Sequence, residues 1–573
     1  MSEQTPNHTS PNHTTGAEAL VRLLADHGVR HIFGLCGDTS LPFYDALARL
    51  DHGMTHILTR DERHAAYMAD AYARLTRRVG ICEGPSGGGA TYIAPGLVEA
   101  NDSSVPVLAI TSDVATTSAG RYPLTKLDQQ ALFRPLTKWN AVLDSAAALP
   151  RTVRRAFREM TTGRPGSAHL ALPFDVQKAE VPEDEIWADA MYGQFPAMRG
   201  EMSLETEQVT NFAEALMSAK APVIVCGGGV VLSGAERELQ HLAETLNIPV
   251  ATTVSGQGSI AETHPNAVGV VGSNGGRPGT RAVVDAADCV VFLGCRAGSV
   301  TTERWRSPAP GATILHIDCD PGVFGASYPT HAAWLGDIRT CLEGLNEIID
   351  ALNEPRDFNG AATAANARAA KETAFRALAD SAETPIKPER VIDALNRLCP
   401  PETVVCADPG TPCPYFSAYW TIQQPGRHFI TNRAHGALGY ALGAAIGAQV
   451  ARPTAKVICA TGDGSFGMSV GEFETITRYR LPITTIVFSN SVFGWIKAGQ
   501  KSGFGGRYFS VDFNRTDHAA VAAAYGVKSW RVEDPGDLDR VLKEAIAHDG
   551  PTLVDVIVQP LQDAEAPVSE WVA

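Results

Sequence analysis

The stretch "TGDGSFGMSVGEFETITRYRLPITTIVFSN", from Thr461 to Asn490, decides the fold of this chain of 573 residues. The apolar run before it predicts a strand that ends in a Gly-Asp-Gly turn around Asp463, and "LPITTIVFSN" predicts a second strand that ends at Asn490. Between them, "SVGEFETITRY" carries apolar residues at three-residue spacing and is expected to be helical. This order predicts parallel strands, so Asp463 and Asn490 should face one crevice at the carboxyl edge of a sheet.

Three interpretations of this stretch are open from its residues alone. The simplest is a plain turn between a strand and a helix. Gly462, Gly464 and Gly467 also satisfy the spacing of a dinucleotide loop, but that motif needs a later acidic residue, and "VCGGGVVLSG" is a better candidate for it. The third is a metal site, because one carboxylate and one amide oxygen suit Mg²⁺, which completes its octahedron with water and ligand phosphates.

Composition excludes several classes of protein. With 44% hydrophobic residues, the chain has ample material for buried cores, and its net charge of −15 argues against nucleic acid or an anionic membrane as a partner. The eleven cysteines include no C-x-x-C pair, so neither a zinc site nor a disulfide framework is predicted. Without a signal peptide or a long apolar run, the expected location is the cytoplasm.

Short apolar runs alternate with helical patterns along almost the whole chain, which predicts an α/β fold of three doubly wound parallel-sheet domains. Two irregular stretches, after Pro173 and from about Asn353 to Lys387, are interpreted as linkers. The expected division is a disordered tail at 1–16, domains at 17–180, 205–350 and 385–560, and a tail at 561–573.

The Gly-Asp-Gly turn with its later asparagine resembles the signature of thiamin-diphosphate enzymes. "HIFGLCGDTSLPFYDAL", "SGGGATYIAPGLVEANDSSVPVLAITSDV" and "AHGALGYALGAAIGAQ" resemble one branch, the acetohydroxyacid synthase-like 2-oxoacid decarboxylases and carboligases. The resemblance covers about residues 17 to 560 in order. It implies that the three domains are a pyrimidine-binding, a central and a diphosphate-binding domain, and that the cofactor is thiamin diphosphate.

The resemblance assigns roles to the opening stretch. Asp463 and Asn490 match the side-chain ligands of Mg²⁺, or of Ca²⁺ in its place, and the carbonyl of Val492 matches the third protein ligand. The metal in turn carries the diphosphate, which explains how an acidic protein binds an anion. Gly464 and Ser465 are expected to donate backbone N–H groups or a hydroxyl to phosphate oxygens.

Other cofactor contacts follow from the same resemblance. Gly410 and Thr411 match the second diphosphate loop. Gly494, two residues after the third metal ligand, matches a glycine of the family's cofactor site. Gly436 would offer its carbonyl to the 4′-amino group. Leu438 matches the bulky apolar residue that forces the cofactor to bend.

Glu62 in "TRDERHAAY" matches the glutamate that hydrogen-bonds the pyrimidine N1′ and promotes deprotonation of the thiazolium ring. By its residues alone, a solvated ion pair at a helix start is the favoured interpretation. Family members assemble each site across two subunits, because this glutamate and the diphosphate site lie in different domains. The resemblance therefore implies a homodimer or a homotetramer.

Further acid–base candidates lie where this sequence departs from the synthase pattern. Asp38 in "GLCGDTSLP" resembles the aspartate of simple 2-oxoacid decarboxylases, although the paired histidines that accompany it there are not evident. His435 is an alternative acid or base, with packing or exposure as the plainer interpretation. Gln129 and Lys138 are candidate substrate contacts.

Two positions argue against branched-chain amino-acid synthesis. Gly499 stands where the synthases carry a tryptophan, and Leu124 and Thr125 stand where they carry a Phe-Gln pair. Several relatives bind FAD or ADP in the central domain, but the glycine-rich segments here do not match the synthase pattern, so neither nucleotide is favoured.

The leading hypothesis is decarboxylation of a small-molecule 2-oxoacid with thiamin diphosphate and Mg²⁺, followed by carboligation to a second carbonyl compound. The alternatives are a simple decarboxylase that releases an aldehyde, and a relative that transfers an acyl group or catalyses β-elimination. A non-catalytic paralogue should have lost Glu62, Asp463 or Asn490, and all three are present.

Overall fold

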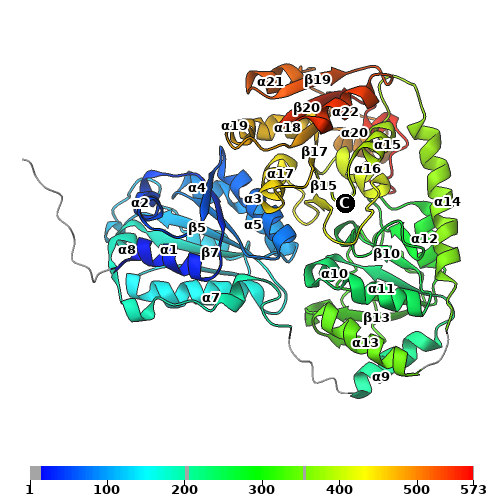
Figure 1. Cartoon of the computed structure of the whole chain (residues 1–573), viewed down its shortest axis with the longest axis horizontal. Coiled ribbons are helices and arrows are strands. Elements are labelled where there is room, and N and C mark those ends of the chain that lie inside the picture. Colours follow the sequence, from blue (N-terminus) through cyan, green and yellow to red (C-terminus); the bar gives the residue numbers. More distant parts are fainter. Residues whose placement is uncertain (1–13, 200–205, 353–355, 572–573) are drawn as a thin grey trace, which may run out of the picture. The chain divides into compact units, whose positions relative to one another are not determined.

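A computed structural model describes residues 14–199, 206–352 and 356–571 (Figure 1). The described residues form two compact units, which are treated separately below. Unit 1 runs to Ala197 without Arg74–Arg77, and unit 2 comprises Arg74–Arg77 and the chain from Met198 onward. Residues 1–13 of the expected N-terminal tail lie outside the described part. The next two residues form β1 (Thr14–Thr15), which pairs antiparallel with β8 (Glu180–Val181).

Unit 1 contains one sheet of six parallel strands in the order β3-β2-β4-β5-β7-β6. Every residue of β4, β5 and β7 is buried, as expected for a parallel sheet that is covered on both faces. The strands are β2 (His31–Gly34), β3 (Thr55–Leu58), β4 (Gly80–Gly84), β5 (Val107–Asp113), β6 (Trp139–Val142) and β7 (Ala168–Pro173).

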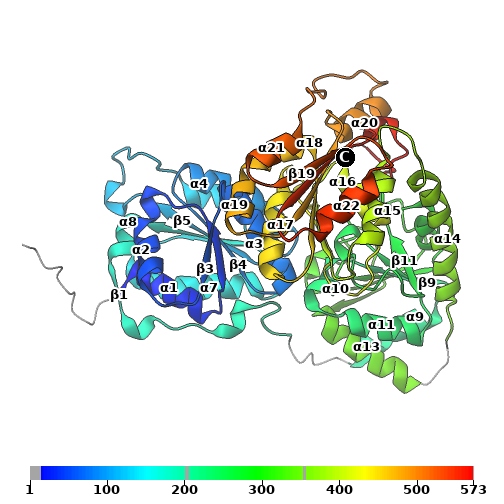
Figure 2. The same ribbon diagram turned by 45° about the horizontal axis from the view of Figure 1, so that its top comes forward.

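Helices of unit 1 pack through apolar stripes. Helix α1 (Gly16–Asp26) contacts α2 (Leu41–Arg49) and α7 (Leu149–Thr161), and Figure 2 shows α1 and α7 side by side along the sheet. Helix α1 begins at a capping box, in which the Thr15 hydroxyl accepts from the Glu18 N–H and the Glu18 carboxylate accepts from the Thr15 N–H. The other long helices of this unit are α3 (Glu62–Thr76) and α5 (Ala94–Asp102).

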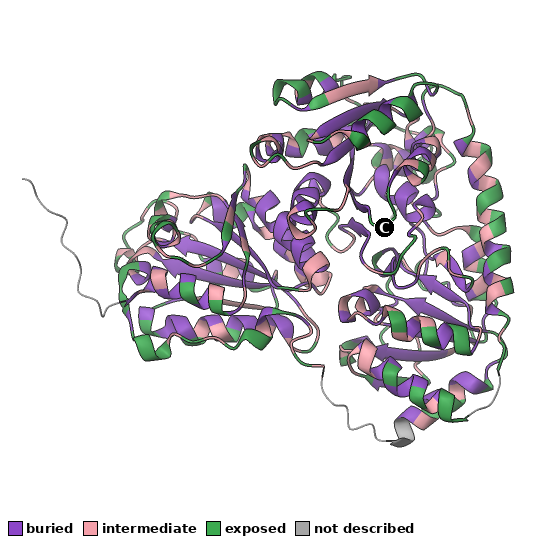
Figure 3. Cartoon of the chain, viewed as in Figure 1, coloured by how far each residue is buried: buried purple, intermediate pink, exposed green. Residues whose placement is uncertain are grey.

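Unit 2 contains two further six-stranded sheets, and both are entirely parallel. The first has the order β11-β10-β9-β12-β13-β14 and the second β16-β15-β17-β18-β20-β19. Figure 3 shows that the strands form the buried interior, with exposed residues on the outer faces of the helices. The strands of the first sheet are β9 (Pro222–Cys226), β10 (Val250–Thr252), β11 (Ala267–Val270), β12 (Cys289–Leu293), β13 (Thr313–Asp318) and β14 (Ala332–Leu335).

The second sheet of unit 2 carries the stretch quoted above. Its strands are β15 (Val404–Ala407), β16 (Phe429–Thr431), β17 (Val457–Gly462), β18 (Thr484–Ser489), β19 (Lys528–Val532) and β20 (Thr552–Ile557). The long helix α14 (Gly360–Ala379) lies between the two sheets in sequence and contacts α15 (Pro388–Leu398) and β11. Three parallel six-stranded sheets with flanking helices confirm the predicted fold class.

The expected helix between β17 and β18 is interrupted. The chain forms α18 (Asp463–Ser469), a short 3-10 turn η8 (Val470–Glu472) and α19 (Phe473–Arg478). The Ser469 hydroxyl donates to the carbonyl of Ser465, a back-bond that bends helices, and glycines in this segment weaken helical order further.

The C-terminal segment after β20 packs within unit 2. The N–H of Gly275 donates to Pro567 O at 2.8 Å, and Ser569 donates to Ser273 O at 3.0 Å. The ring of Trp571 lies 5.1 Å from that of Trp495. Within the ranges that the structure describes, no helix is both long and apolar enough to cross a membrane.

Candidate functional site

The carboxyl edge of the second sheet of unit 2 brings the two predicted metal ligands together. Strands β17 and β18 are parallel neighbours, with Gly462 paired to Phe488. Asp463 directly follows β17 and Asn490 directly follows β18. This placement confirms that both side chains lie at the ends of neighbouring strands.

Asp463 is buried and accepts three backbone hydrogen bonds. Its Oδ2 accepts from the N–H groups of Asn490 at 2.8 Å and Ser491 at 2.6 Å, and its Oδ1 accepts from Gly464 at 2.9 Å. Burial raises the pKa of Asp463, and these N–H groups oppose that rise because they stabilise the carboxylate. The carboxylate therefore closes the loop between the two strands and keeps lone-pair capacity for a cation.

Asn490 has an unsatisfied side chain. Its Oδ1 and Nδ2 are both buried, and neither has a hydrogen-bond partner among the described residues. An unpaired buried polar group costs about 1–3 kcal/mol, so native proteins seldom keep one without a ligand to satisfy it. An unpaired amide oxygen at this strand end, on a residue whose backbone contacts Asp463, fits a hard cation.

The other possible metal ligands around Asp463 and Asn490 also indicate a hard cation. Within the described ranges, no cluster of three or more His, Cys, Asp or Glu side chains could hold a metal. A cation at this site would thus be held by one carboxylate, one amide and backbone oxygens, which suits Mg²⁺. Val492, whose carbonyl is the third predicted ligand, is buried and forms an isolated antiparallel bridge with Asp512.

Glycines at this edge leave room that a side chain would fill. A Cβ atom on Gly464 would lie 2.7 Å from the ring of Phe493, so only glycine fits without displacement of that ring. Gly410 at φ +97° and Gly436 at φ +72° adopt left-handed backbone conformations. Ser465, in the first turn of α18, is buried.

The two predicted cofactor loops meet in the structure. Gly494 begins α20 (Gly494–Gly503), and a Cβ atom on it would lie 3.4 Å from the Oγ1 of Thr411, which precedes α16 (Pro412–Tyr419). A Cβ atom on Gly439 would lie 3.3 Å from Met468 Cβ, so the turn that contains Gly436 and the half-buried Leu438 approaches α18.

Asp408 is a site residue that the sequence analysis missed. It is fully buried just after β15, and its Oδ1 accepts from the N–H groups of Tyr440 at 2.7 Å and Ala441 at 3.2 Å. Its Oδ2 accepts from the Thr461 hydroxyl at 2.8 Å. Asp408 thereby ties the start of α17 (Tyr440–Ala451) to the end of β17. An aspartate directly after a strand, in "VCADPG", is the signal that points to it.

A second missed cluster supports the residue before Asn490. Ser489 donates to the buried Asp555 carboxylate of β20, and its Oγ lies 3.1 Å from Nδ1 of His518. His518 also packs edge-on against Phe466, with ring centroids 5.2 Å apart. No local motif in the sequence marks this cluster, because its members come from three separate segments.

His435, predicted as an alternative acid or base, lies on the exposed turn before α17. It stays a prediction, since its exposure in the described chain neither requires nor prevents a catalytic role. Gly499, at the position of the missing tryptophan, is buried in α20.

In unit 1, Glu62 is the first residue of α3 and only 7% exposed, so the solvated ion pair that the residues alone allowed is wrong. Cβ atoms on Gly84 and Gly89 would lie 3.2 Å from its Cγ and 2.9 Å from its Oε1. The glycine-rich turn after β4 therefore makes room for this carboxyl. Burial raises the pKa of Glu62, which favours its acid form.

Asp38 opens a 3-10 turn, η1 (Asp38–Ser40), and is exposed. Next to it, a row of hydroxyl groups, here called the hydroxyl row, follows the carboxyl ends of the strands. Thr39 Oγ1 lies 2.7 Å from Ser112 Oγ and 3.1 Å from Ser86 Oγ. Ser86 Oγ lies 2.7 Å from Thr125 Oγ1, the position where the synthases carry an amide.

Two candidate substrate contacts are engaged inside unit 1. Gln129 is buried, accepts from the Thr111 hydroxyl and donates to Ser112 O at 2.9 Å. Lys138 Nζ donates to Thr162 O at 2.7 Å. Both have structural partners in unit 1, and their contact with substrate stays a prediction.

The glycine-rich loops of the first sheet of unit 2 pack on each other. Cβ atoms on Gly227 and Gly229 would lie 2.1 Å from Gly294 O and 2.7 Å from Gly294 Cα. Close backbone packing thus accounts for two of the three glycines of "VCGGG", Gly227 and Gly229.

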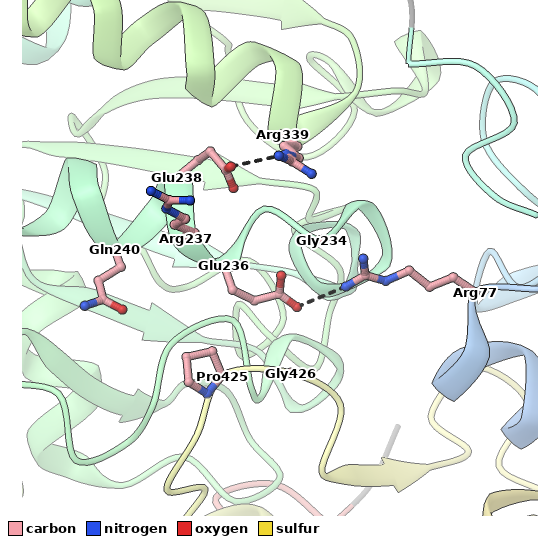
Figure 4. Close-up of a pocket in the computed structure, with 9 residues that line it drawn as sticks. All are labelled: Arg77, Gly234, Glu236, Arg237, Glu238, Gln240, Arg339, Pro425 and Gly426. Carbon is pink, nitrogen blue, oxygen red and sulfur yellow. Dashed lines mark hydrogen bonds and ion pairs between the residues drawn. The ribbon is translucent and has the colours of Figure 1, made fainter. Parts of the chain in front are cut away.

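A cavity of about 460 Å³ lies at the start of α11 (Glu236–Thr245). Figure 4 shows Glu238 directed at Arg339, and the two form an ion pair at 3.1 Å. The cavity contains none of the predicted site residues.

Comparison with protein families covers most of the chain. Residues 14–132 match the N-terminal thiamine pyrophosphate (TPP) binding domain of thiamine pyrophosphate enzymes, residues 209–345 their central domain, and residues 408–556 their C-terminal TPP binding domain.

Individual relatives agree with the family models. A probable acetolactate synthase large subunit from Methanococcus aeolicus is 35% identical, with 95% of this chain and 92% of the relative aligned. The corresponding protein of Methanocaldococcus jannaschii is 35% identical over 96% of this chain and 92% of its own length. Acetolactate synthase isozyme 3 large subunit of Escherichia coli is 31% identical over 93% of this chain and 92% of its own length. With all three domains matched in order, the chain belongs to the thiamine pyrophosphate enzymes and groups with acetolactate synthase large subunits.

Proposed function

We propose that the protein is a thiamin-diphosphate- and Mg²⁺-dependent enzyme that decarboxylates a 2-oxoacid and joins the product to a second carbonyl compound. The observation that carries this proposal is the unsatisfied, buried side-chain amide of Asn490, a residue whose backbone N–H donates to the Asp463 carboxylate. The similarity to acetolactate synthases favours carboligation over release of an aldehyde.

The residues present fit this cofactor. Asp463, Asn490 and the Val492 carbonyl would hold Mg²⁺, while Gly464 and Ser465 lie where the diphosphate would contact backbone and hydroxyl donors. When bound, thiamin diphosphate supplies a thiazolium ring that acts as the electron sink for decarboxylation.

Glu62 would bind the other end of the cofactor. Its buried carboxyl keeps a proton more readily than a solvated glutamate, which suits it to share that proton with the pyrimidine N1′. Asp38, at the carboxyl edge of the same sheet, is the candidate for moving a proton at the substrate.

We further propose that each site is completed in a homodimer, or in a tetramer of two such dimers. Glu62 belongs to unit 1 and Asp463 to unit 2, and family members combine these two parts from different subunits. FAD and ADP are not part of the proposal, because the glycine-rich segments do not match the synthase pattern and Gly227 and Gly229 pack on Gly294.

The test is to incubate the protein with thiamin diphosphate, Mg²⁺ and a panel of 2-oxoacids that includes pyruvate, and to measure CO₂ and identify products by NMR. We expect CO₂ together with a 2-hydroxy-3-oxo acid or a related ligation product. An aldehyde as the sole product would replace carboligation by simple decarboxylation, and no CO₂ from any acid would overturn the proposal.

A variant pair separates catalysis from folding. Glu62→Gln should lower turnover by at least about 100-fold, the usual range for loss of a general acid or base. Glu159→Gln, on the exposed side of α7, should leave turnover unchanged, since Glu159 only pairs with Arg155 at the surface.

A further inference from the structure

Glu83 is a second buried carboxyl close to Glu62. It is 1% exposed on β4, and the next residue, Gly84, is the one against which the Glu62 side chain lies. Strand β2 places Gly34 opposite Glu83, and a Cβ atom there would lie 3.0 Å from Glu83 Oε2. The neighbouring strand thus carries a glycine where the carboxyl needs space.

The two oxygens of Glu83 differ. Oε2 accepts from the Tyr44 hydroxyl at 2.6 Å, and Tyr44 Oη lies 2.9 Å from Nε2 of the half-buried His56. Oε1 is buried and has no hydrogen-bond partner among the described residues. Glu83 therefore connects to the surface of unit 1 on one side and keeps an unsatisfied oxygen on the other.

Glu83 lies within a group of titratable side chains. Tyr44 on α2, Cys36 after β2, Glu62 on α3 and Cys82 on its own strand interact with it electrostatically. None of these four is a cation at neutral pH, and Glu62 is the proposed active-site carboxyl whose charge acts on Glu83. Two carboxyls in such surroundings do not both ionise readily.

We propose that Glu83 is a positioning residue for the proton chemistry of Glu62: it stays in its acid form beside Glu62, and its ionisation changes how tightly Glu62 holds a proton. This role rests on the proposed function and makes Glu83 a second titrating group beside Glu62. Desolvation, with a smaller contribution from the charge of Glu62, raises the pKa of Glu83 to about 8, and interactions with the Tyr44 and Ser40 hydroxyls oppose part of that rise.

The consequence is a second inflection in the pH profile. While Glu83 is neutral, burial and, to a smaller extent, the charged neighbour Asp61 raise the pKa of Glu62. Once Glu83 loses its proton, the new negative charge strengthens proton binding at Glu62. A step that depends on Glu62 should therefore change near the pKa of Glu83 as well as near that of Glu62.

The first test uses the protein without cofactor. Infrared difference spectra across a pH series should show a protonated carboxyl band that disappears near pH 8, the pKa of Glu83. Glu83→Gln should remove this band. Glu99→Gln should retain it, since Glu99 is a fully buried carboxyl of α5 that bonds to Ser103.

The second test uses the complete enzyme with thiamin diphosphate and Mg²⁺. Deuterium exchange at the thiazolium C2, followed by NMR, should show an inflection near pH 8 that Glu83→Gln abolishes and Glu99→Gln leaves in place. Tyr44→Phe should move it to higher pH, because it removes a hydrogen bond that stabilises the Glu83 carboxylate.

The outcomes separate the two proposals. An unchanged inflection in Glu83→Gln would overturn the role of Glu83, as would a shift to lower pH in Tyr44→Phe. Absence of cofactor-dependent exchange in the unmodified protein would instead refute the proposed function, while the infrared band would still report on Glu83. If Glu83→Gln does not fold, the direction in which Tyr44→Phe moves the inflection decides the test.

Discussion

At the scale of single residues, each unit has buried polar groups that the fold leaves unsatisfied at or near its proposed active-site residues. Asn490 keeps both polar atoms of its amide unpaired, Glu83 keeps one oxygen unpaired, and Asp463 is a carboxylate in a buried environment. Each arrangement costs free energy in the cofactor-free chain. Substitutions at these positions should therefore impair function more than they lower the free energy of unfolding.

Replacement of Asn490 by leucine tests this expectation. The substitution removes an unpaired amide and keeps the side-chain size, so the free energy of unfolding of the cofactor-free protein should be unchanged or rise by about 1 kcal/mol. Affinity for Mg²⁺ and thiamin diphosphate should fall sharply. Urea unfolding and calorimetric titration measure the two quantities.

Asn266 provides the matched control. Its amide donates to the backbone carbonyls of Ala243 and Ile248, so Asn266→Leu should destabilise the protein by about 1–3 kcal/mol without change in cofactor binding. Equal destabilisation by both substitutions would contradict the view that Asn490 is unsatisfied.

Glu83 also predicts how stability varies with pH. Its pKa is raised from 4.5 to about 8 in the fold. A carboxyl with a raised folded pKa contributes its full stability below the unfolded pKa and loses it as pH rises through the folded value. The free energy of unfolding should fall between about pH 4.5 and about pH 8, and Glu83→Gln should flatten that slope in urea titrations. A slope identical to that of the parent protein would exclude this assignment.

At the scale of elements, the strand ends could be predicted from the sequence. The contacts from other elements that hold these strand ends in place could not. Asp463 and Asn490 could be placed because apolar runs reveal strands and parallel neighbours share an edge. Asp408 also directly follows a strand, but its hydrogen bonds could not be predicted, since its partners lie 32 and 53 residues further along the chain. The burial of Glu83 was equally hidden, because it depends on Gly34 and Tyr44 from other elements.

Helix α18 offers a test at this scale. Gly464→Ala should displace the Phe493 ring, which lies 2.7 Å from the added Cβ, and weaken cofactor binding at least tenfold. Gly467→Ala, in the same helix with no atom within 4 Å of its Cβ, should leave binding intact and raise stability by up to about 1 kcal/mol. Cofactor titration and thermal unfolding compare the pair. Equal binding by the two variants would remove Gly464 from the diphosphate cradle.

At the scale of the whole molecule, the proposed homodimer makes a quantitative prediction. Glu62→Gln and Asp463→Ala should each be inactive, but a heterodimer of the two would carry one site with both substitutions and one site with neither. Random reassociation at equal amounts should therefore restore about a quarter of the original activity. Mixing after mild dissociation, followed by an activity assay, tests it. No recovery despite subunit exchange would mean that each subunit builds its own complete site.

The hydroxyl row of unit 1 has a fixed direction. A hydroxyl has one proton to give, and Thr125 gives its proton to the Leu124 carbonyl at 2.6 Å. Ser86 must then donate to Thr125, Thr39 to Ser86, and Ser112 to Thr39. A single backbone oxygen thus orients every dipole in the row. If the loop that carries that oxygen moves, all of these protons become free to turn the other way together.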